Sequence, residues 1–359
     1  MSAIPEGIDP NEPKSRPLPN IPIAASLRAS RRRMPSWLPQ ALGYGVSIAC
    51  LVWVLRDYSI GDLIPAIRSL DWKWVVLSVA ADLAAYLVHA WRWQTLLNPV
   101  VRLHFWRTVQ AVYIGLFANE VLPLRVGELI RCYLLAHWND LRLSLGFASA
   151  AVERLIDGLL MVATFIVTAS FVKGIPRDII ILVQLIGVLL LFGTVIMAWV
   201  VFHKQHAHLM MAESRWAATL RHIVEGLHLM GNRRTLGITT LISLIYLVLQ
   251  VVSYWALMKA YGFDLSFWVA GAVLAIVRFG TVVPNAPGNV GLTQVACLAA
   301  LKLFDVEPNV AKTFSFVLNL VTVLPLLISG AVATALTGLN IGELRDRAQR
   351  GAETVTPNA

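Results

Sequence analysis

The stretch FWRTVQAVYIGLFANEVLPLRVGELIRCYLLA, residues 105–136, is apolar enough to enter a membrane but contains residues that break a helix or carry charge. These interruptions are Pro123, Arg125, Gly127 and Glu128. Residues 266–304 show the same pattern. Their interruptions are Pro284, Pro287, Gly288 and Gly291. Because proline and glycine kink or end helices, each stretch predicts either one kinked span or a re-entrant hairpin of two short helices, the second helix following Pro123 or Pro284.

The composition of the 359-residue chain excludes an ordinary water-soluble protein. Apolar residues make up 57% and charged residues 14% of the chain, against about 45–50% and about 25% in soluble domains. The 12 Trp residues fit a membrane protein, because Trp collects at membrane–water interfaces. In a membrane protein, a net charge of +9 is first a sign of how the chain is oriented in the membrane, and only second a sign of anionic partners. We therefore expect a polytopic, all-α integral membrane protein that binds no nucleic acid.

Uninterrupted apolar stretches close to the length that crosses a bilayer, about 20 residues, are found at six places. They are residues 38–55, 73–97, 145–170, 178–202, 236–259 and 311–336. With two hairpins, 17 of the 30 Lys and Arg residues fall on one face, 8 on the other and 5 inside the membrane. Cytoplasmic loops are enriched in Lys and Arg. The prediction is six full transmembrane helices plus two re-entrant helical hairpins, in the inner (cytoplasmic) cell membrane with both termini cytoplasmic. The alternative is eight transmembrane helices.

The membrane domain is predicted to cover residues 37–338 and to contain an inverted repeat. Pro123 and Gly127 match Pro284 and Gly288 at an offset of 161 residues. The same offset lays residues 73–170 over 234–331, so each half is a span, a hairpin and a span. Inverted repeats with broken helices are typical of secondary transporters. The remaining segments are predicted to be a disordered basic cytoplasmic tail (1–36), an interfacial helix (about 207–230) and a cytoplasmic tail (339–359).

Ionisable residues inside the predicted spans are the main candidates for function, because charge is costly in a bilayer. Five are acids and five are bases: Asp82, Glu120, Glu128, Glu153, Asp157, Arg92, Arg125, Arg131, Arg154 and Arg278. One interpretation is a lattice of structural salt bridges. The other is a polar cavity that receives an anionic headgroup, since the planar guanidinium of Arg binds phosphate with two hydrogen bonds.

The second interpretation predicts substrate-binding residues around the two helix breaks. They are Asn119, Arg125, Glu128, Arg131, Glu153, Arg154, Asp157, Arg278, Pro284, Asn285 and Gly288. A proton relay is predicted at Asp82, His89 and Glu128. No motif or ligand spacing indicates a catalytic residue, a metal site or a cofactor, and the three cysteines form no disulfide framework.

Three motifs resemble signatures of one family. They are NEVLPLRVGELIR (119–131), AVERLIDG (151–158) and VPNAPGNVGL (283–292). The family is the lysylphosphatidylglycerol synthase transmembrane region, also called the flippase-like or UPF0104 family, and the resemblance covers residues 40–336. It implies an integral membrane fold with a lipid substrate. We expect a stand-alone member, because the chain stops about 20 residues after the last predicted span, too early for the separate aminoacyl-transfer domain. Gln294 departs from the family, where the third motif often continues to an acid.

The leading hypothesis is a lipid translocase that moves an anionic or lipid-linked headgroup between leaflets, and not an enzyme. An anionic phospholipid, a polyprenyl phosphate or a hopanoid-type lipid fits as substrate. One alternative is a membrane-embedded transferase acting on a lipid-linked donor, with Glu128 or Asp157 as base. Another is an accessory subunit that partners a lipid or glycolipid synthase. The sequence leaves self-association, the lipid and the energy source open.

Overall fold

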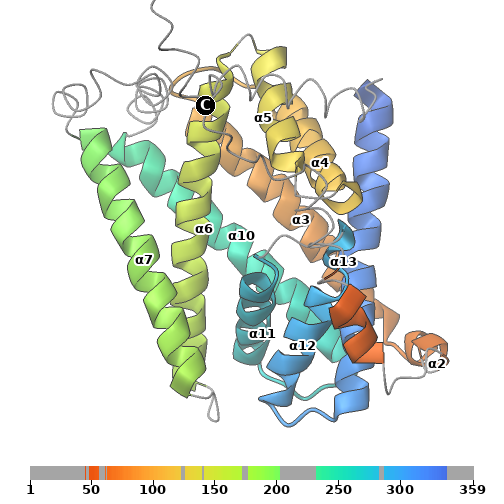
Figure 1. Ribbon diagram of the computed structural model, residues 1–359. Helices are drawn as coiled ribbons and strands as arrows, with labels where there is room; N and C mark the ends of the chain where they lie inside the picture. Colours follow the sequence, from red (N-terminus) through yellow and green to blue (C-terminus); the bar gives the residue numbers. More distant parts are fainter. Residues whose placement is uncertain are drawn as a thin grey trace, which may run out of the picture. The chain divides into compact units, whose positions relative to one another are not determined.

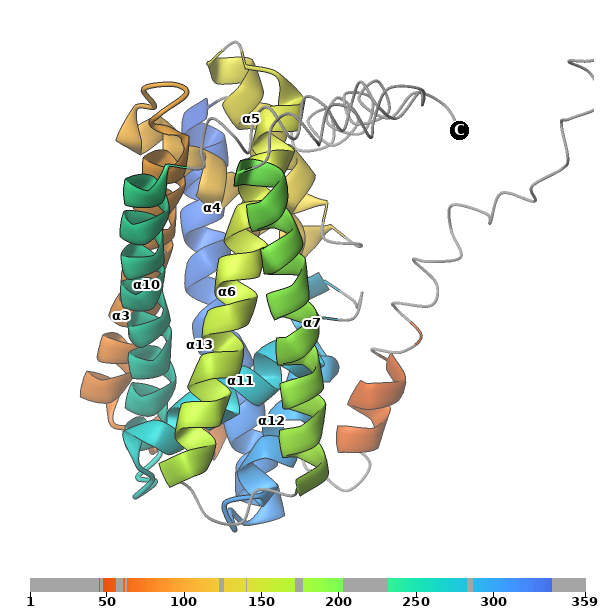
Figure 2. The same cartoon turned by 90° about the vertical axis from the view of Figure 1, so that its left-hand side faces the viewer.

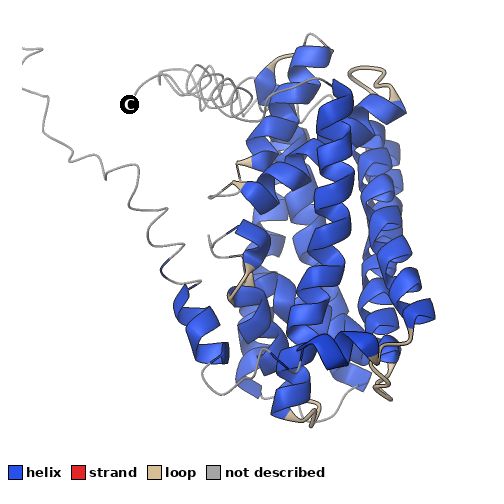
Figure 3. Ribbon diagram, turned by 90° about the vertical axis from the view of Figure 1, so that its right-hand side faces the viewer, coloured by secondary structure: helices blue, strands red, loops and turns tan. Residues whose placement is uncertain are grey.

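The computed structural model describes residues 45, 48–55, 61, 63–122, 126–139, 141–171, 177–202, 232–282 and 287–337. All of them belong to one structural unit, residues 39–359. Regular secondary structure in the described part is entirely helical (Figure 3). The all-α prediction is therefore confirmed for these residues. The predicted tails, the predicted interfacial helix at 207–230 and half of the predicted span at 38–55 lie outside them.

The helices follow the apolar stretches of the sequence (Figure 1). In chain order they are α2 (Leu63–Arg68), α3 (Trp72–Leu97), α4 (Phe105–Val121), α5 (Gly127–Trp138), α6 (Leu143–Phe171), α7 (Arg177–Phe202), α10 (Arg233–Ala260), α11 (Phe267–Gly280), the 3₁₀ turn η4 (Pro287–Asn289), α12 (Leu292–Lys302) and α13 (Pro308–Thr337). Five of the six predicted spans thus correspond to the long helices α3, α6, α7, α10 and α13.

Three of these helices, α3, α10 and α13, are long and apolar enough to cross a membrane by length and composition, among the residues described. A helix rises about 1.5 Å per residue, so the 26 residues of α3 exceed the hydrocarbon thickness of about 30 Å. Their outer surfaces are apolar as well. Exposed side chains on α13 recur every four residues at Leu320, Leu324, Ile328, Val332 and Leu336. A soluble protein rarely exposes such a continuous apolar strip. The chain is a multi-pass membrane protein.

The two interrupted stretches each form a pair of short helices. Helices α4 and α5 have 17 and 12 residues, and α11 and α12 have 14 and 11. Each is shorter than the roughly 20 residues that a crossing needs. The members of each pair pack against each other. The α4–α5 pair lies at one end of the bundle and the α11–α12 pair at the other (Figures 1 and 2).

The second break differs from the first in where the helix resumes. α5 begins at Gly127, but α12 begins only at Leu292, after the η4 turn. Gly288 and Gly291 have φ angles of 72° and 92°, a region that glycine enters without steric cost. The chain needs this left-handed backbone to turn from η4 into α12. The predicted match of Gly127 with Gly288 therefore holds for the position of the break and not for the start of the helix.

Gly127 lies where α4 and α5 approach each other closely in the first pair of helices. Its N–H donates a hydrogen bond of 2.8 Å to the Asn119 side-chain oxygen. A Cβ at Gly127 would collide with the backbone oxygen of Gly115 and with the Asn119 side chain. The oxygen of Asn119, which the sequence predicts as a substrate ligand, also joins the end of α4 to the start of α5.

Gly127→Ala is therefore expected to destabilise the protein by about 1–3 kcal/mol, the usual cost of overpacking. The matched control is Gly237→Ala in α10, where a Cβ meets nothing within 4 Å and alanine favours the helix. Thermal unfolding of both purified variants in detergent checks this. Equal midpoints for the two variants would contradict the close approach of α4 and α5.

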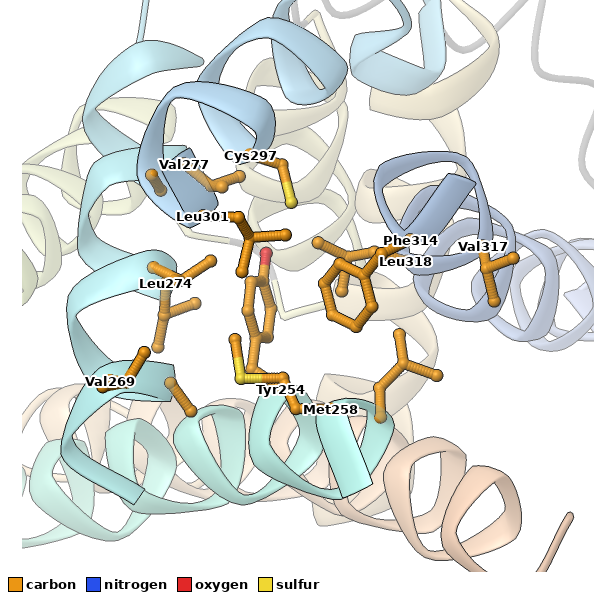
Figure 4. Packing of buried hydrophobic residues seen from close by; sticks show 14 of the residues in the cluster. Tyr254, Met258, Val269, Leu274, Val277, Cys297, Leu301, Phe314, Val317 and Leu318 are labelled. Atoms are coloured by element: carbon orange, nitrogen blue, oxygen red, sulfur yellow. The ribbon is translucent and has the colours of Figure 1, made fainter. Parts of the chain in front are cut away.

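The core on the side of the second pair joins α10, α11, α12 and α13 (Figure 4). Tyr254, Leu274, Leu301 and Phe314 come from these four helices in turn, and their side chains point toward one another. A second cluster joins α3, α4, α5 and α6 to the last turns of α13.

Helices α3 and α10 connect the two ends. The Ser78 hydroxyl donates to the Ser253 carbonyl at 2.8 Å, and Arg92 contacts Ser243. Residue numbers rise along α3 as they fall along α10, so the two helices are antiparallel.

Candidate functional site

Arg92 of α3 lies at the centre of a buried network of charged side chains. The residue is completely buried, and its guanidinium forms a two-pronged ion pair with Asp157 of α6, in which Nη2 donates to Oδ2 at 3.1 Å. The same group donates to the Ser243 hydroxyl of α10 at 3.2 Å and lies 3.5 Å from Glu153. Three helices are therefore joined at one side chain, which a charge buried in a membrane needs in order to be tolerated.

Glu153 of α6 connects this network to α5. Its Oε2 accepts a hydrogen bond of 2.8 Å from Arg131. The Arg131 guanidinium also lies 4.4 Å from the centre of the Trp93 ring, a cation–π contact. Glu153 is 1% exposed and Arg131 4% exposed. These residues thus form a closed structural pair rather than a free binding group.

His89 lies between the two arginines. Its Nδ1 is 3.1 Å from Nη2 of Arg92, and its Nε2 contacts Nη1 of Arg131. Both guanidinium groups can only donate. A neutral imidazole can accept from one of them, whereas a protonated ring would place donors against donors on both sides. The position between two guanidinium groups therefore favours the neutral form of His89 over the protonated form.

The pair formed by Glu128 of α5 and Arg154 of α6 is different, because it is accessible to solvent. The two side chains are 36% and 56% exposed. Exposed ion pairs contribute about 0–1 kcal/mol to stability. The pair is therefore free to exchange its partners for a ligand at little cost.

A polar cavity of about 120 Å³ lies between the two helix breaks. Asn119 and Gly127 line it from the first break and Asn289 from the second. Its charged lining residues are Glu120, Glu128, Arg131, Arg154, Asp157 and Arg278. His89 and Tyr246 also line it. We call it the larger cavity, because a second, smaller polar cavity adjoins it. Irregular backbone inside a membrane is tolerated where it lines such a cavity.

A second polar cavity, of about 80 Å³, adjoins it. Five residues line both: Tyr86, Glu120, Arg278, Asn289 and Leu326. This smaller cavity also has Asp82, Gln250, Thr281, Asn319 and Thr322 in its walls. Arg278 is exposed into these spaces, and among the described residues no carboxylate lies within ion-pair distance of its guanidinium.

A family model described as "Lysylphosphatidylglycerol synthase TM region" matches residues 40–330. The chain belongs to this family. A UPF0104 membrane protein of Methanothermobacter thermautotrophicus is 20% identical over 299 residues, which make up 77% of this chain and 86% of the relative. A UPF0104 membrane protein of Methanocaldococcus jannaschii is 22% identical over 235 residues, 63% of this chain and 96% of the relative.

Membership of the lysylphosphatidylglycerol synthase TM family confirms the resemblance predicted from the three motifs. It also indicates a function connected with membrane lipids. Two charged residues from each of the first two motifs pair between α5 and α6, Glu128 with Arg154 and Arg131 with Glu153.

The structure brings most of the predicted site residues together. Glu128, Arg131, Arg154, Asp157 and Arg278 line the larger cavity, and Glu153 lies behind it. Gly288 lies in η4, where its carbonyl accepts a hydrogen bond of 2.9 Å from Asn319. Arg125, Pro284 and Asn285 lie outside the described residues.

The predicted proton relay is not contiguous in the part of the chain described. Asp82 lines the smaller cavity only, His89 contacts Arg92 and Arg131, and Glu128 pairs with Arg154. No hydrogen bond between any two of the three is present among these residues. The relay stays a prediction.

Neutral polar residues of the cavities were missed by the sequence reasoning, which looked for charge. They include Tyr246, Gln250, Asn289 and Asn319. A signal existed for one pair, since Tyr246 and Gln250 are one turn apart in an otherwise apolar stretch and are joined by a hydrogen bond of 2.9 Å. Within the described residues, no group of three His, Cys, Asp or Glu side chains is placed to hold a metal.

Proposed function

We propose that the protein is a lipid translocase, in which the larger cavity receives the anionic headgroup of a lipid and passes it between leaflets. The observation that carries this proposal is the presence of two arginines that are not held by a buried acid, Arg154 and Arg278, in one polar cavity between two broken helices. A guanidinium binds phosphate with two parallel hydrogen bonds. The protein needs no bond-making group for this function, because translocation changes only the position of the headgroup.

Arg278 is the first contact for the headgroup in this proposal. Arg131 and Arg92 are committed to Glu153 and Asp157, whereas Arg278 has no carboxylate partner among the described residues. An uncompensated charge in a membrane is costly, and a phosphate would supply the missing counter-ion. Arg154 would add a second contact by exchanging Glu128 for the phosphate. Arg125, Pro284 and Asn285 are proposed to complete the site from the breaks.

The lipid chains have a place next to this cavity. An apolar cavity of about 230 Å³ is lined by α6, α10 and α11, including Leu160, Leu247 and Trp268. Leu160 lies one helical turn from Asp157, which lines the larger cavity. On α6, the polar and the apolar cavity therefore take lining residues from neighbouring turns, and we propose that the headgroup lies at the first and part of a lipid chain at the second.

We propose that the architecture behind this function is six full transmembrane helices plus two re-entrant hairpins in an inverted repeat. Its support is the length of α4, α5, α11 and α12 and their placement at opposite ends of the bundle. The protein is proposed to lie in the cell membrane with both termini cytoplasmic, as the distribution of Lys and Arg predicts. A lipid-synthesis enzyme is the proposed partner that would supply its substrate.

The test is transport by purified protein in liposomes. Phosphatidylglycerol or phosphatidylcholine carrying a fluorescent label is placed in the vesicles, and a membrane-impermeant quencher reports the fraction in the outer leaflet. We expect the protein to flip the anionic lipid faster than the zwitterionic one. Arg154→Gln should slow anionic flipping by about fivefold to tenfold, about 1 kcal/mol of headgroup binding.

The matched control is Arg107→Gln, which removes an arginine that stacks on Trp138 outside both cavities. It should flip lipids at the wild-type rate. Equal flipping of both lipids, or no flipping above that of protein-free vesicles, would refute the translocase. Production of a modified lipid in the same vesicles would favour the transferase instead.

A further inference from the structure

Asp82 of α3 is a buried acid without a partner in the part of the chain that the structure describes. The residue is 5% exposed and lines the smaller cavity. Its Oδ2 atom is buried without a hydrogen-bond partner, and no ion pair joins Asp82 to a described basic residue. A carboxylate buried in this way costs free energy, and a bound proton removes that cost by neutralising the charge.

The wall of the smaller cavity offers hydrogen-bond donors as well as acceptors. The amide groups of Gln250 and Asn319 each use one N–H in a hydrogen bond of 2.9 Å, and each keeps a second N–H. Arg278, the basic side chain of the described wall, can only donate. Donors in the wall oppose a bound metal ion, whereas a proton on Asp82 needs no shell of oxygen ligands. The proton is the cation that suits this cavity.

The two polar cavities together give protons a route to Asp82. The smaller cavity, of about 80 Å³, has room for a few waters. It shares Arg278 and four other lining residues with the larger cavity. The larger cavity in turn contains the Glu128–Arg154 pair, which is accessible to solvent. Water in the joined space would therefore carry protons between the solvent and Asp82.

The titratable and charged groups around Asp82 come from four helices. They are Tyr86 of α3, Tyr113 and Glu120 of α4, Tyr254 of α10 and Arg278 of α11. The lining residues from α12 and α13 do not titrate. Tyrosine and arginine ordinarily keep their protons near neutral pH, and Glu120 has an interaction elsewhere in the chain. Asp82 is therefore the group of this wall that is best placed to exchange a proton.

Arg278 connects this proton to the headgroup. Its guanidinium lines both cavities. While it holds no anion, its positive charge stabilises the ionised form of Asp82 across the smaller cavity. A phosphate bound to Arg278 cancels that charge, so Asp82 loses its counter-charge and takes up a proton. Because such coupling is reciprocal, a proton on Asp82 also strengthens the binding of the phosphate.

We infer that Asp82 is a proton-binding site and that one proton crosses the membrane with each anionic headgroup. This coupling rests on the proposed function. A headgroup with one phosphodiester carries one negative charge, which the proton cancels, so the two move together without net charge. The carboxyl releases its proton when the headgroup leaves Arg278. A proton gradient would therefore drive translocation, and a membrane potential would not.

Proton uptake is measured on the full-length protein in detergent, without any transport. Short-chain phosphatidylglycerol is added in weakly buffered solution near neutral pH, and an indicator dye follows the pH. The phosphodiester does not titrate in this range, so a proton that disappears from solution has gone to the protein. We expect uptake that saturates at no more than one proton per bound lipid. Asp82→Asn should abolish it.

Two controls match this variant. Asp178→Asn removes an exposed carboxylate at the start of α7 and should leave the uptake unchanged. Glu120→Gln removes the other acid of the smaller cavity and should also keep it. If Asp82→Asn does not fold, Asp82→Glu decides, because it should shift the infrared band of the protonated carboxyl that forms on lipid binding. An unshifted band would assign the proton to another group.

Liposomes test whether the proton moves with the lipid. A gradient of about one pH unit, worth about tenfold for one proton, should enrich labelled phosphatidylglycerol in the leaflet on the alkaline side by up to about tenfold. A potassium diffusion potential alone should enrich neither leaflet. In Asp82→Asn the pH gradient should have no effect on the distribution, whereas Asp178→Asn should respond like wild type.

The outcomes separate the two proposals. Lipid flipping without proton uptake, or uptake that survives in Asp82→Asn and is lost in Glu120→Gln, would overturn the proton site and keep the translocase. Flipping that follows the membrane potential and ignores the pH gradient would overturn the coupling. Proton uptake by a protein that flips no lipid would leave Asp82 as a proton-binding site and refute the translocase alone.

Discussion

Glu153→Leu is expected to lower the free energy of unfolding by about 3–5 kcal/mol, the cost of removing one partner from a buried ion pair. Glu153 is the acid between Arg131 and Arg92, with contacts of 2.8 and 3.5 Å. Leucine has a similar volume but no charge, so Arg92 would keep Asp157 as its ion-pair partner, whereas Arg131 would lose its ion-pair partner among the described residues. Unfolding by SDS titration from mixed micelles measures the loss.

The comparison is Glu128→Leu, which removes the acid of the solvent-exposed pair with Arg154. It should cost no more than about 1 kcal/mol. The double variant Arg131→Leu with Glu153→Leu should lose less than the two single changes together, because it leaves no unpaired partner. If Glu153→Leu and Glu128→Leu were equally stable, the buried network would not be the structural element described here.

Arg278→Gln is expected to slow the flipping of an anionic lipid by about tenfold to a hundredfold. The estimate assumes that the headgroup loses a hydrogen bond to a charged group, about 1.5–3 kcal/mol. Arg278 has no carboxylate partner among the described residues, so its loss should leave the fold intact. The same liposome assay measures the rate.

Arg278→Lys sharpens this test. Lysine keeps the charge but loses the two-pronged geometry, so its flipping rate should fall between those of Arg278→Gln and wild type. Arg107→Gln serves again as the neutral control. Wild-type flipping by Arg278→Gln in correctly folded protein would remove Arg278 from the headgroup site.

The helices themselves were predictable because each depends on a local property of the sequence. Apolar length predicted α3, α6, α7, α10 and α13, and prolines and glycines predicted the breaks in the two interrupted stretches. The start of α12 at Leu292 was not predictable by that route. It depends on the η4 turn, on positive φ angles at Gly288 and Gly291, and on a hydrogen bond from Asn319 of α13 to the Gly288 carbonyl, a contact between residues far apart in the sequence.

The partners of the charged residues were harder to predict. Spacing places Glu128 and Arg131 on one face of α5, because residues three apart are neighbours on a helix. In the structure each pairs with α6, Glu128 with Arg154 and Arg131 with Glu153. Spacing within a helix gives a shared face but does not tell which helix lies opposite. That depends on how the whole bundle packs.

The apolar strip of α13 has a geometric consequence. Residues four apart on a helix are offset by about 40°, so the strip from Leu320 to Leu336 winds about 160° around the axis. The buried side of α13 winds with it, from Phe314 beside α10 and α12 to Gly330 beside Phe117 of α4. α13 therefore packs against both helix pairs, α12 of one and α4 of the other, through sides that lie about 160° apart around its own axis.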